Sequence, residues 1–199
     1  MDKFKNKYRI PSARLQNWDY GSDGSYFITI CTKGREHFFG EIINDEMQLS
    51  EMGKLAEHYW IDIPNHFKYI ELGNFVVMPN HVHGILIIDK INISPVSSVS
   101  SVPIVETRLI ASLQSNVPSK TKQIGGFAGN KNPMLNDNIS RICRWYKGRC
   151  SFEINKIHAD FEWQARFHDH IIRNAESFER NQAYIENNPT NWSNDKFYN

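Results

Sequence analysis

Two apolar, strand-like segments joined by a turn dipeptide constrain the fold of this chain more than any other part of its sequence. Residues 75–77 read Phe-Val-Val, residues 85–88 read Ile-Leu-Ile-Ile, and the heptapeptide Met-Pro-Asn-His-Val-His-Gly lies between them at positions 78–84. Proline followed by asparagine favours a tight turn between two strands. The pattern therefore predicts a β-hairpin with strands at residues 69–78 and 81–89.

The second predicted strand begins with two histidines, His81 and His83, which are separated by a single valine. Because side chains two residues apart share one face of a strand, the imidazoles would lie side by side and could converge on one cation, whereas Val82 would point into a core. Neutral imidazoles also pack half-buried, with one ring nitrogen bonded to a backbone carbonyl. The pair alone therefore fits either a metal site or a structural role.

Hydrophobic periodicity, residue type and capping residues predict the other elements. β-branched and aromatic residues predict a strand at residues 26–32, and a further hairpin at residues 38–49 would turn at residues 44–46. The predicted helices begin after Ser50, Asp137 and Asn174, and the first and last of them stop at Pro64 and Pro189. Strands and helices thus follow one another along the chain, except between residues 92 and 136.

The length and composition predict one domain, residues 1–199, with an insert at residues 92–136. At 199 residues, with 40% hydrophobic and 13% aromatic residues, the chain can bury a substantial core. Residues 92–136 are rich in Ser, Val, Pro, Gly and Asn and show no periodicity. Such a segment is typical of a functional loop or a flexible insert within a domain.

The sequence also predicts a cytoplasmic protein that does not enter a membrane. No apolar run approaches the roughly 20 residues that span a bilayer, and residues 1–7 lack the apolar segment of a signal peptide. Cys31, Cys143 and Cys150 are odd in number and have no zinc-like spacing. We therefore expect reduced thiols in the core, and neither disulfides nor a cysteine-based zinc site.

Basic residues are unevenly distributed, although the formal net charge is only +1. This low charge argues against a generally basic surface for nucleic acid. Two segments are locally basic, and their candidates for phosphate contacts are Lys5, Arg9, Arg141, Arg144 and Lys147. Near the N-terminus the cations alternate with Phe4 and Tyr8, which suits a strand of nucleic acid, but a solvated, frayed terminus is the commoner explanation of such a run.

The final predicted helix carries a tyrosine on a polar face. Phe178 and Ile185 mark the buried face of this helix, whereas the residues three and four positions from Tyr184 on either side are arginine or asparagine. Helical tyrosines more often fill cores or interfaces than act as nucleophiles, but polar neighbours weaken the core interpretation. Asn188, one turn later, could offer its amide oxygen to the same metal as the histidines.

Several segments together resemble the HUH single-tyrosine transposases, and most closely the REP-associated tyrosine transposases. They are residues 78–84, Trp163-Gln164 with Phe167, residues 170–174 (His-Ile-Ile-Arg-Asn) and residues 184–192 (Tyr-Ile-Glu-Asn-Asn-Pro-Thr-Asn-Trp). The resemblance extends from Tyr26 to Trp192, apart from the insert. It implies an α+β fold, a ferredoxin-like or RRM-like antiparallel β-sheet with helices packed on one face.

The resemblance also implies an active site and a cofactor. His81 and His83 match the HUH histidines, Asn188 matches the third ligand of a divalent metal, Mg²⁺ or Mn²⁺, and Tyr184 matches the nucleophile. The implied reaction is cleavage and rejoining of single-stranded DNA next to a hairpin or imperfect palindrome, through a 5′-phosphotyrosine intermediate. Arg173 lies in a matching segment and is a further candidate for DNA contact. No general base for Tyr184 is identified.

Two other functions fit the same residues. An inactive protein derived from a transposase would bind hairpin DNA without cleaving it, and an unrelated His-x-His metal phosphoesterase would not need Tyr184. The resemblance implies a bacterial, nucleoid-associated protein. It leaves open whether the chain acts as a monomer or as a homodimer in which the tyrosine helix of one subunit completes the site of the other.

Overall fold

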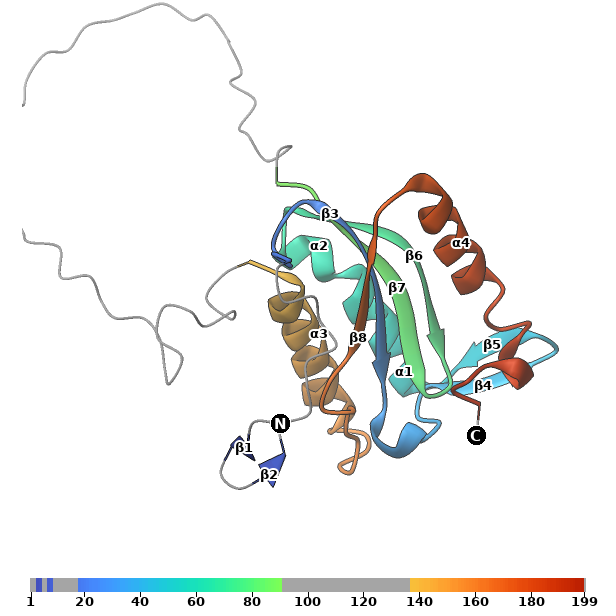
Figure 1. Cartoon of the computed structure of the whole chain (residues 1–199). Helices are drawn as coiled ribbons and strands as arrows, with labels where there is room; N and C mark the ends of the chain where they lie inside the picture. Colours follow the sequence, from blue (N-terminus) through green and yellow to red (C-terminus); the bar gives the residue numbers. More distant parts are fainter. Residues whose placement is uncertain (1–2, 5–6, 9–17, 91–136, 199) are drawn as a thin grey trace, which may run out of the picture.

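A four-stranded antiparallel β-sheet is the centre of the fold. The structure, a computed structural model, describes residues 3–4, 7–8, 18–90 and 137–198. The strands lie in the order β6 (Ile70–Met78), β7 (His81–Ile88), β3 (Gly24–Cys31) and β8 (His168–Ile172), each antiparallel to its neighbours (Figure 1). This sheet, with its packed helices, confirms the predicted α+β fold class.

β6 and β7 form the hairpin that the turn dipeptide predicts. Met78 pairs with His81, so Pro79 and Asn80 are the two residues of the connecting loop. On its other side β7 pairs with β3, where His83 lies opposite Thr29. β7 is therefore an interior strand, and backbone hydrogen bonds from both neighbours hold the part that carries the histidines.

Helices cover both faces of the sheet. α1 (Glu51–Ile61) and α3 (Ile139–Ile154) pack against one face and form the larger core with it. α4 (Ala175–Glu186) lies over the opposite face, where Ile185 packs in a cluster with Phe27 (Figure 1). The expectation of helices on a single face thus holds for α1 and α3 but is wrong for α4, because the interior strands carry apolar side chains on both faces.

Polar side chains cap the three longer helices. Ser50 caps α1, Asn138 caps α3 and Asn174 caps α4, and each side chain accepts a hydrogen bond from the backbone N–H three residues later. Pro64 lies in the first turn of a short helix, α2 (Ile63–His66), directly after α1 has ended. Proline is tolerated there because the first turn of a helix needs no amide donor.

Shorter elements complete the described chain. β4 (Gly40–Ile43) and β5 (Glu46–Leu49) form the second predicted hairpin, in which Asn44 and Asp45 adopt the positive φ of a tight turn. The remaining elements are β1 (Lys3–Phe4), β2 (Lys7–Tyr8) and the 3-10 turns η1 (Lys33–Arg35) and η5 (Trp192–Asn194). The edge strand β8 was not among the predicted elements.

Gly84 allows helix α1 to approach β7 closely. A Cβ atom on Gly84 would lie 2.3 Å from Cζ2 of Trp60 and 2.9 Å from Cβ of Phe75. Trp60 is fully buried, and its ring meets that of Tyr146 edge-on at 5.2 Å between centroids. The indole therefore fills the space above Gly84, which is the next residue along β7 after His83.

The chain leaves the sheet and returns to the fold at one place. The ammonium group of Lys90, just beyond β7, donates to the carbonyl oxygens of Gly21 at 2.5 Å and Asp137 at 3.3 Å. Asp137 precedes α3, so the residues that flank positions 91–136 lie side by side. The predicted insert at residues 92–136 lies outside the described residues.

Two expectations about the environment of the chain can be compared with this fold. In the parts of the chain that the structure describes, no helix has the length and apolar character needed to cross a membrane. Cys31, Cys143 and Cys150 are buried and unbridged, as predicted for core thiols.

Candidate active site

His81 and His83 lie at the start of β7, on the sheet face that α4 covers. Their side chains are at most 1% exposed, and their ring centroids are 4.4 Å apart. The hairpin and the pairing with β3 fix both positions, and alternation along the strand sends Val82 into the core on the other face. The structure thus brings the two imidazoles together as the sequence pattern predicts.

Each imidazole is held through its Nδ1 atom. Nδ1 of His81 lies 2.8 Å from Oδ1 of Asn80, and Nδ1 of His83 lies 2.8 Å from Oγ1 of Thr29. An amide oxygen only accepts hydrogen bonds, so Nδ1 of His81 carries the proton and its Nε2 atom keeps a free lone pair. This is the arrangement by which a neighbouring group orients a metal-binding histidine.

Both histidines are neutral at physiological pH. Burial lowers the pKa of His81 from 6.5 to about 3, although the charge of Asp195 acts in the opposite direction. Burial, followed by the proximity of His81, holds the pKa of His83 well below its ordinary value. Neutral imidazole is the form that binds a metal ion.

Tyr184 projects from α4 toward His83. Its hydroxyl oxygen lies 3.4 Å from Nε2 of His83 and donates a 2.9 Å hydrogen bond to Oδ2 of Asp195. The side chain is 39% exposed, so the hydroxyl can meet an external substrate. Burial of part of the ring and the neighbouring Asp195 carboxylate raise the pKa of Tyr184 well above its ordinary value.

Asn188 approaches the histidines from just beyond the end of α4. The helix ends at Glu186, as expected before Pro189, and the Asn188 side chain is almost fully buried. Its Nδ2 atom donates to Oδ2 of Asp195 at 2.9 Å. Its Oδ1 atom is buried without a hydrogen-bond partner.

Two unpartnered atoms make this residue set suitable for a metal ion. Nε2 of His81 and Oδ1 of Asn188 are both buried without a hydrogen-bond partner, a state that costs about 1–3 kcal/mol per group when nothing binds there. Imidazole nitrogen and amide oxygen, with Nε2 of His83, form a donor set compatible with Mg²⁺ or Mn²⁺. The described residues contain no cluster of three His, Cys, Asp or Glu side chains suited to a metal, so the third donor would be the amide.

Asp195 and Phe197, which follow η5, pack beside the histidines and Tyr184. The ring of Phe197 lies 4.6 Å from that of His81, and the backbone N–H of Phe197 donates to Oδ1 of Asp195 at 2.7 Å. Burial alone would raise the pKa of Asp195, but the hydrogen bonds from Phe197, Asn188 and Tyr184 outweigh it and hold the pKa below its ordinary value. Asp195 is therefore an anion in contact with both Tyr184 and Asn188.

Sequence patterns missed three side chains of this site: Thr29, Asn80 and Asp195. Asn80 is fully buried and also donates to the carbonyl oxygens of Phe197 at 2.9 Å and Arg35 at 3.2 Å. Its place next to the histidines was interpreted only as a turn position. Asp195 carries no local signal, because its role depends on how the end of the chain folds back.

The predicted DNA contacts are separated from one another. Lys5 and Arg9 lie outside the described residues. Arg141, Arg144 and Lys147 lie on α3, across the sheet from Tyr184, where Arg141 forms an ion pair with Asp137 and Lys147 donates to the carbonyl oxygen of Gln164 at 2.5 Å. Arg144 is exposed.

Arg173 lies on the same side of the sheet as α4. It is exposed and lines a hollow of about 500 Å³ together with His170 and Arg180. Arg180 also lines an adjoining hollow of about 470 Å³ around Tyr184 and Asn188. Asp169 and Glu176 also line the first hollow, and Nη1 of Arg180 lies 3.8 Å from Oε1 of Glu176, so the two arginines lie among carboxylates between the end of β8 and the tyrosine.

Tyr146, a tyrosine of α3, belongs to the core. Its hydroxyl is fully buried and donates to the backbone oxygen of Ala56 at 3.0 Å.

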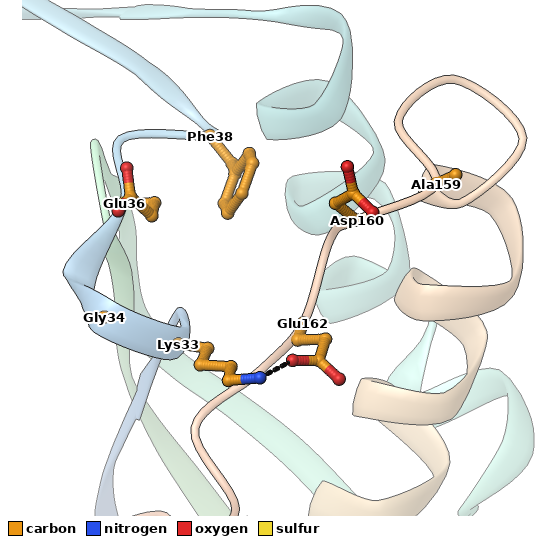
Figure 2. A pocket seen from close by; sticks show the side chains of 7 residues that line it. All are labelled: Lys33, Gly34, Glu36, Phe38, Ala159, Asp160 and Glu162. Atoms are coloured by element: carbon orange, nitrogen blue, oxygen red, sulfur yellow. Dashed lines mark hydrogen bonds and ion pairs between the residues drawn. The ribbon is translucent and has the colours of Figure 1, made fainter.

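A third hollow, of about 550 Å³, lies near η1 and is lined by Glu36, Asp160 and Glu162 (Figure 2). Lys33 in this hollow pairs with Glu162, so its remaining charge is negative and does not suit a phosphate backbone.

Comparison with known proteins identifies one relative in sequence and a likeness in fold. No protein-family model matches the chain. An uncharacterized protein of Haemophilus influenzae is 35% identical over 188 residues, which cover 94% of this chain and 92% of the relative.

Two solved structures are similar in fold. A REP-associated tyrosine transposase bound to a REP hairpin has a TM-score of 0.53 and 17% identity, over 92% of this chain and 74% of that one. A transposase-like protein of Deinococcus radiodurans has a TM-score of 0.42 and 15% identity, over 88% of this chain and 97% of that one, a likeness too weak to support an argument.

Proposed function

The chain belongs to the same family as the Haemophilus influenzae protein and has the fold of a REP-associated tyrosine transposase, and from this premise we propose that it cleaves and rejoins DNA. The proposed substrate is single-stranded DNA next to a hairpin. The proposed enzyme is a metal-dependent endonuclease and strand transferase with Tyr184 as its nucleophile.

One observation carries the proposal. The unpartnered atoms Nε2 of His81 and Oδ1 of Asn188 lie beside a half-exposed tyrosine hydroxyl that is 3.4 Å from Nε2 of His83. A purely structural histidine pair would normally have both ring nitrogens satisfied by the protein, since a buried unpaired polar atom costs free energy. Donor atoms left free next to a nucleophile are what a metal-assisted attack needs.

His81, His83 and Asn188 would hold the metal ion. A bound Mg²⁺ or Mn²⁺ supplies Lewis-acid polarisation of the scissile phosphodiester. The protein contributes neutral imidazoles oriented through Asn80 and Thr29, so the donors are already in place before substrate arrives.

The proposed step is attack by the Tyr184 oxygen on phosphorus. A bond from this oxygen to phosphorus forms while the bond from phosphorus to the leaving 3′ oxygen breaks. The phenolic proton of Tyr184 passes to solvent water and the leaving 3′ oxygen takes up a proton from solvent, which gives a 5′-phosphotyrosine link and a 3′-hydroxyl. One phosphate ester replaces another, so the 3′-hydroxyl can reverse the attack without a nucleotide cofactor.

The surroundings of Tyr184 suit an unpaired strand. Arg173 offers a cation to a phosphate backbone in the hollow beside β8, and Arg180 offers a second one that it shares with Glu176. The exposed Asn187 and Asn191 add amide groups near the tyrosine. An unpaired strand can be shaped so that one phosphate lies in line with a helix-borne hydroxyl. Tyr184 contacts His83 of its own chain, which supports a site completed within one subunit.

Covalent capture tests the proposal. The purified chain is mixed with Mn²⁺ and a pool of labelled single-stranded oligonucleotides whose hairpin stem and flanking bases are randomised, and adducts are separated on a denaturing gel. We expect a covalent adduct from the wild type and none from Tyr184→Phe, which removes only the attacking oxygen. Tyr198→Phe, at another exposed tyrosine, is the matched control and should form the adduct at the wild-type level.

Three results would contradict the proposal in different ways. No adduct from any oligonucleotide, with hairpin binding retained, would favour an inactive hairpin-binding protein. An adduct that persists in Tyr184→Phe would assign another nucleophile. Turnover of a small phosphoester by Tyr184→Phe, without any DNA adduct, would favour a His-x-His phosphoesterase.

A further inference from the structure

The carboxylate of Asp195 joins the nucleophile to the third metal donor. Its Oδ2 atom accepts two hydrogen bonds, from the Tyr184 hydroxyl at 2.9 Å and from Nδ2 of Asn188 at 2.9 Å. Its Oδ1 atom accepts the backbone N–H of Phe197 at 2.7 Å, which fixes the plane of the carboxylate. Oδ2 of Asp195 is therefore shared by the Tyr184 hydroxyl and the Asn188 amide.

This contact decides which end of the Asn188 amide faces the histidines. An ionised carboxylate only accepts hydrogen bonds, so it binds the NH₂ end of the amide and repels the oxygen end. With Nδ2 turned toward Asp195, Oδ1 is the end left free, and it is buried without a partner, as is Nε2 of His81. A flipped amide would set two oxygens against each other and offer the metal an NH₂ group, which has no lone pair to donate.

We propose that Asp195 is the positioning residue of the site, which holds the Asn188 amide with its oxygen toward the metal and holds the Tyr184 hydroxyl beside His83. The inference rests on the proposed function, because it assigns a role within that metal site. This positioning role is distinct from removal of the Tyr184 proton, because Asp195 acts through the two residues that it binds.

Asp195→Asn is the informative change. The new side chain has the same size, and its oxygen can still accept the Phe197 N–H. Its NH₂ group can donate to Oδ1 of Asn188, so the amide loses its preference for one orientation. We expect Mn²⁺ affinity to fall about 10-fold, the lower end of the 10- to 100-fold loss seen when a group that orients a metal ligand is removed.

A double-mutant cycle on metal affinity separates positioning from a structural effect. Free Mn²⁺ is counted by electron paramagnetic resonance, without DNA, for the wild type, Asp195→Asn, Asn188→Ala and the double variant. If Asp195 acts through the Asn188 oxygen, Asp195→Asn costs about 10-fold alone and less than about 2-fold in the Asn188→Ala background. Asp160→Asn removes the same charge from the acidic hollow near η1 and should leave affinity unchanged.

A kinetic measurement tests the contact between Asp195 and Tyr184. In single-turnover reactions with a cleavable hairpin strand and saturating Mn²⁺, Asp195→Asn should slow adduct formation at least 10-fold while DNA affinity stays within about 2-fold. Unfolding curves without metal identify any variant that does not fold. Asn188→Ser replaces Asn188→Ala in the cycle if the alanine variant is unfolded.

The outcomes distinguish this inference from the proposed function. Equal losses of Mn²⁺ affinity in both backgrounds, or no loss in either, would overturn the positioning role and leave the proposed function standing. A wild type that binds no Mn²⁺ would remove the metal site, and this inference with it. Coupled losses of Mn²⁺ affinity in a chain that never forms a DNA adduct would support the positioning role and contradict the nuclease.

Discussion

Gly84→Ala should destabilise this protein more than Gly73→Ala, the same change at the other glycine of strands β6 and β7. The added Cβ would lie 2.3 Å from Cζ2 and 2.8 Å from Cε2 of Trp60, against the 3.4 Å or more of an ordinary contact. The indole or the strand would have to move by about 1 Å. Trp60 is fully buried between Phe75 and Tyr146, so its ring has no free space to enter.

We expect this change to lower the free energy of unfolding by about 3 kcal/mol, the upper end of the usual cost of overpacking. Urea unfolding followed by tryptophan fluorescence measures the loss. Gly148→Ala is the matched control: Gly148 lies inside α3 with nothing within 4 Å of its added Cβ, so alanine there should stabilise by about 0.5–1 kcal/mol.

A second substitution tests whether the clash is the cause. In a Trp60→Leu background the side chain above Gly84 is smaller, so Gly84→Ala should cost at least about 1 kcal/mol less than it does alone. The reasoning would be refuted by a Gly84→Ala protein within about 0.5 kcal/mol of the wild type, or by an unchanged cost in the Trp60→Leu background.

Two further changes test the support of the histidines. Asn80→Ala removes the fully buried partner of His81, Arg35 and Phe197, so urea unfolding should show a loss of about 2–3 kcal/mol; a loss below about 0.5 kcal/mol would contradict the role assigned to these hydrogen bonds. Acidification in the presence of EDTA should destabilise the fold between pH 6.5 and about 3, because burial lowers the pKa of His81 to about 3 and only the unfolded chain takes up the proton. The loss is at most about 1.4 kcal/mol per pH unit from this histidine, and the pH slope should be smaller in His81→Gln; equal slopes would contradict the assignment.

Local signals were sufficient wherever a few adjacent residues determine the structure. The Pro79-Asn80 turn set the register of β6 and β7, and Ser50 and Asn174 set the starts of α1 and α4. The alternation of side chains along β7 then placed His81 and His83 on one face. These features depend on neighbours within a few positions, so one sequence contains what is needed to predict them.

The features that could not be predicted depend on tertiary contacts between distant parts of the chain. The periodicity of α4 marks its apolar side but does not say which face of the sheet receives it. β3 gave a hint, because Phe27 and Ile28 are adjacent and both apolar, as expected for a strand covered on both faces. Asp195 gave no hint, since it meets Tyr184 and Asn188 only after the chain has turned back beside η5.

Because Lys90 and Asp137 meet, the stretch between them begins and finishes at one place on the fold. This place lies just beyond Ile88, the end of β7 opposite to His81. The two ends of the strand are roughly 20–25 Å apart at the usual rise per residue. The entropy of closing a loop grows only with the logarithm of its length, and a doubling costs about 0.6 kcal/mol. A change in the number of residues between Lys90 and Asp137 should therefore cost the fold little and leave the histidine end of β7 as it is.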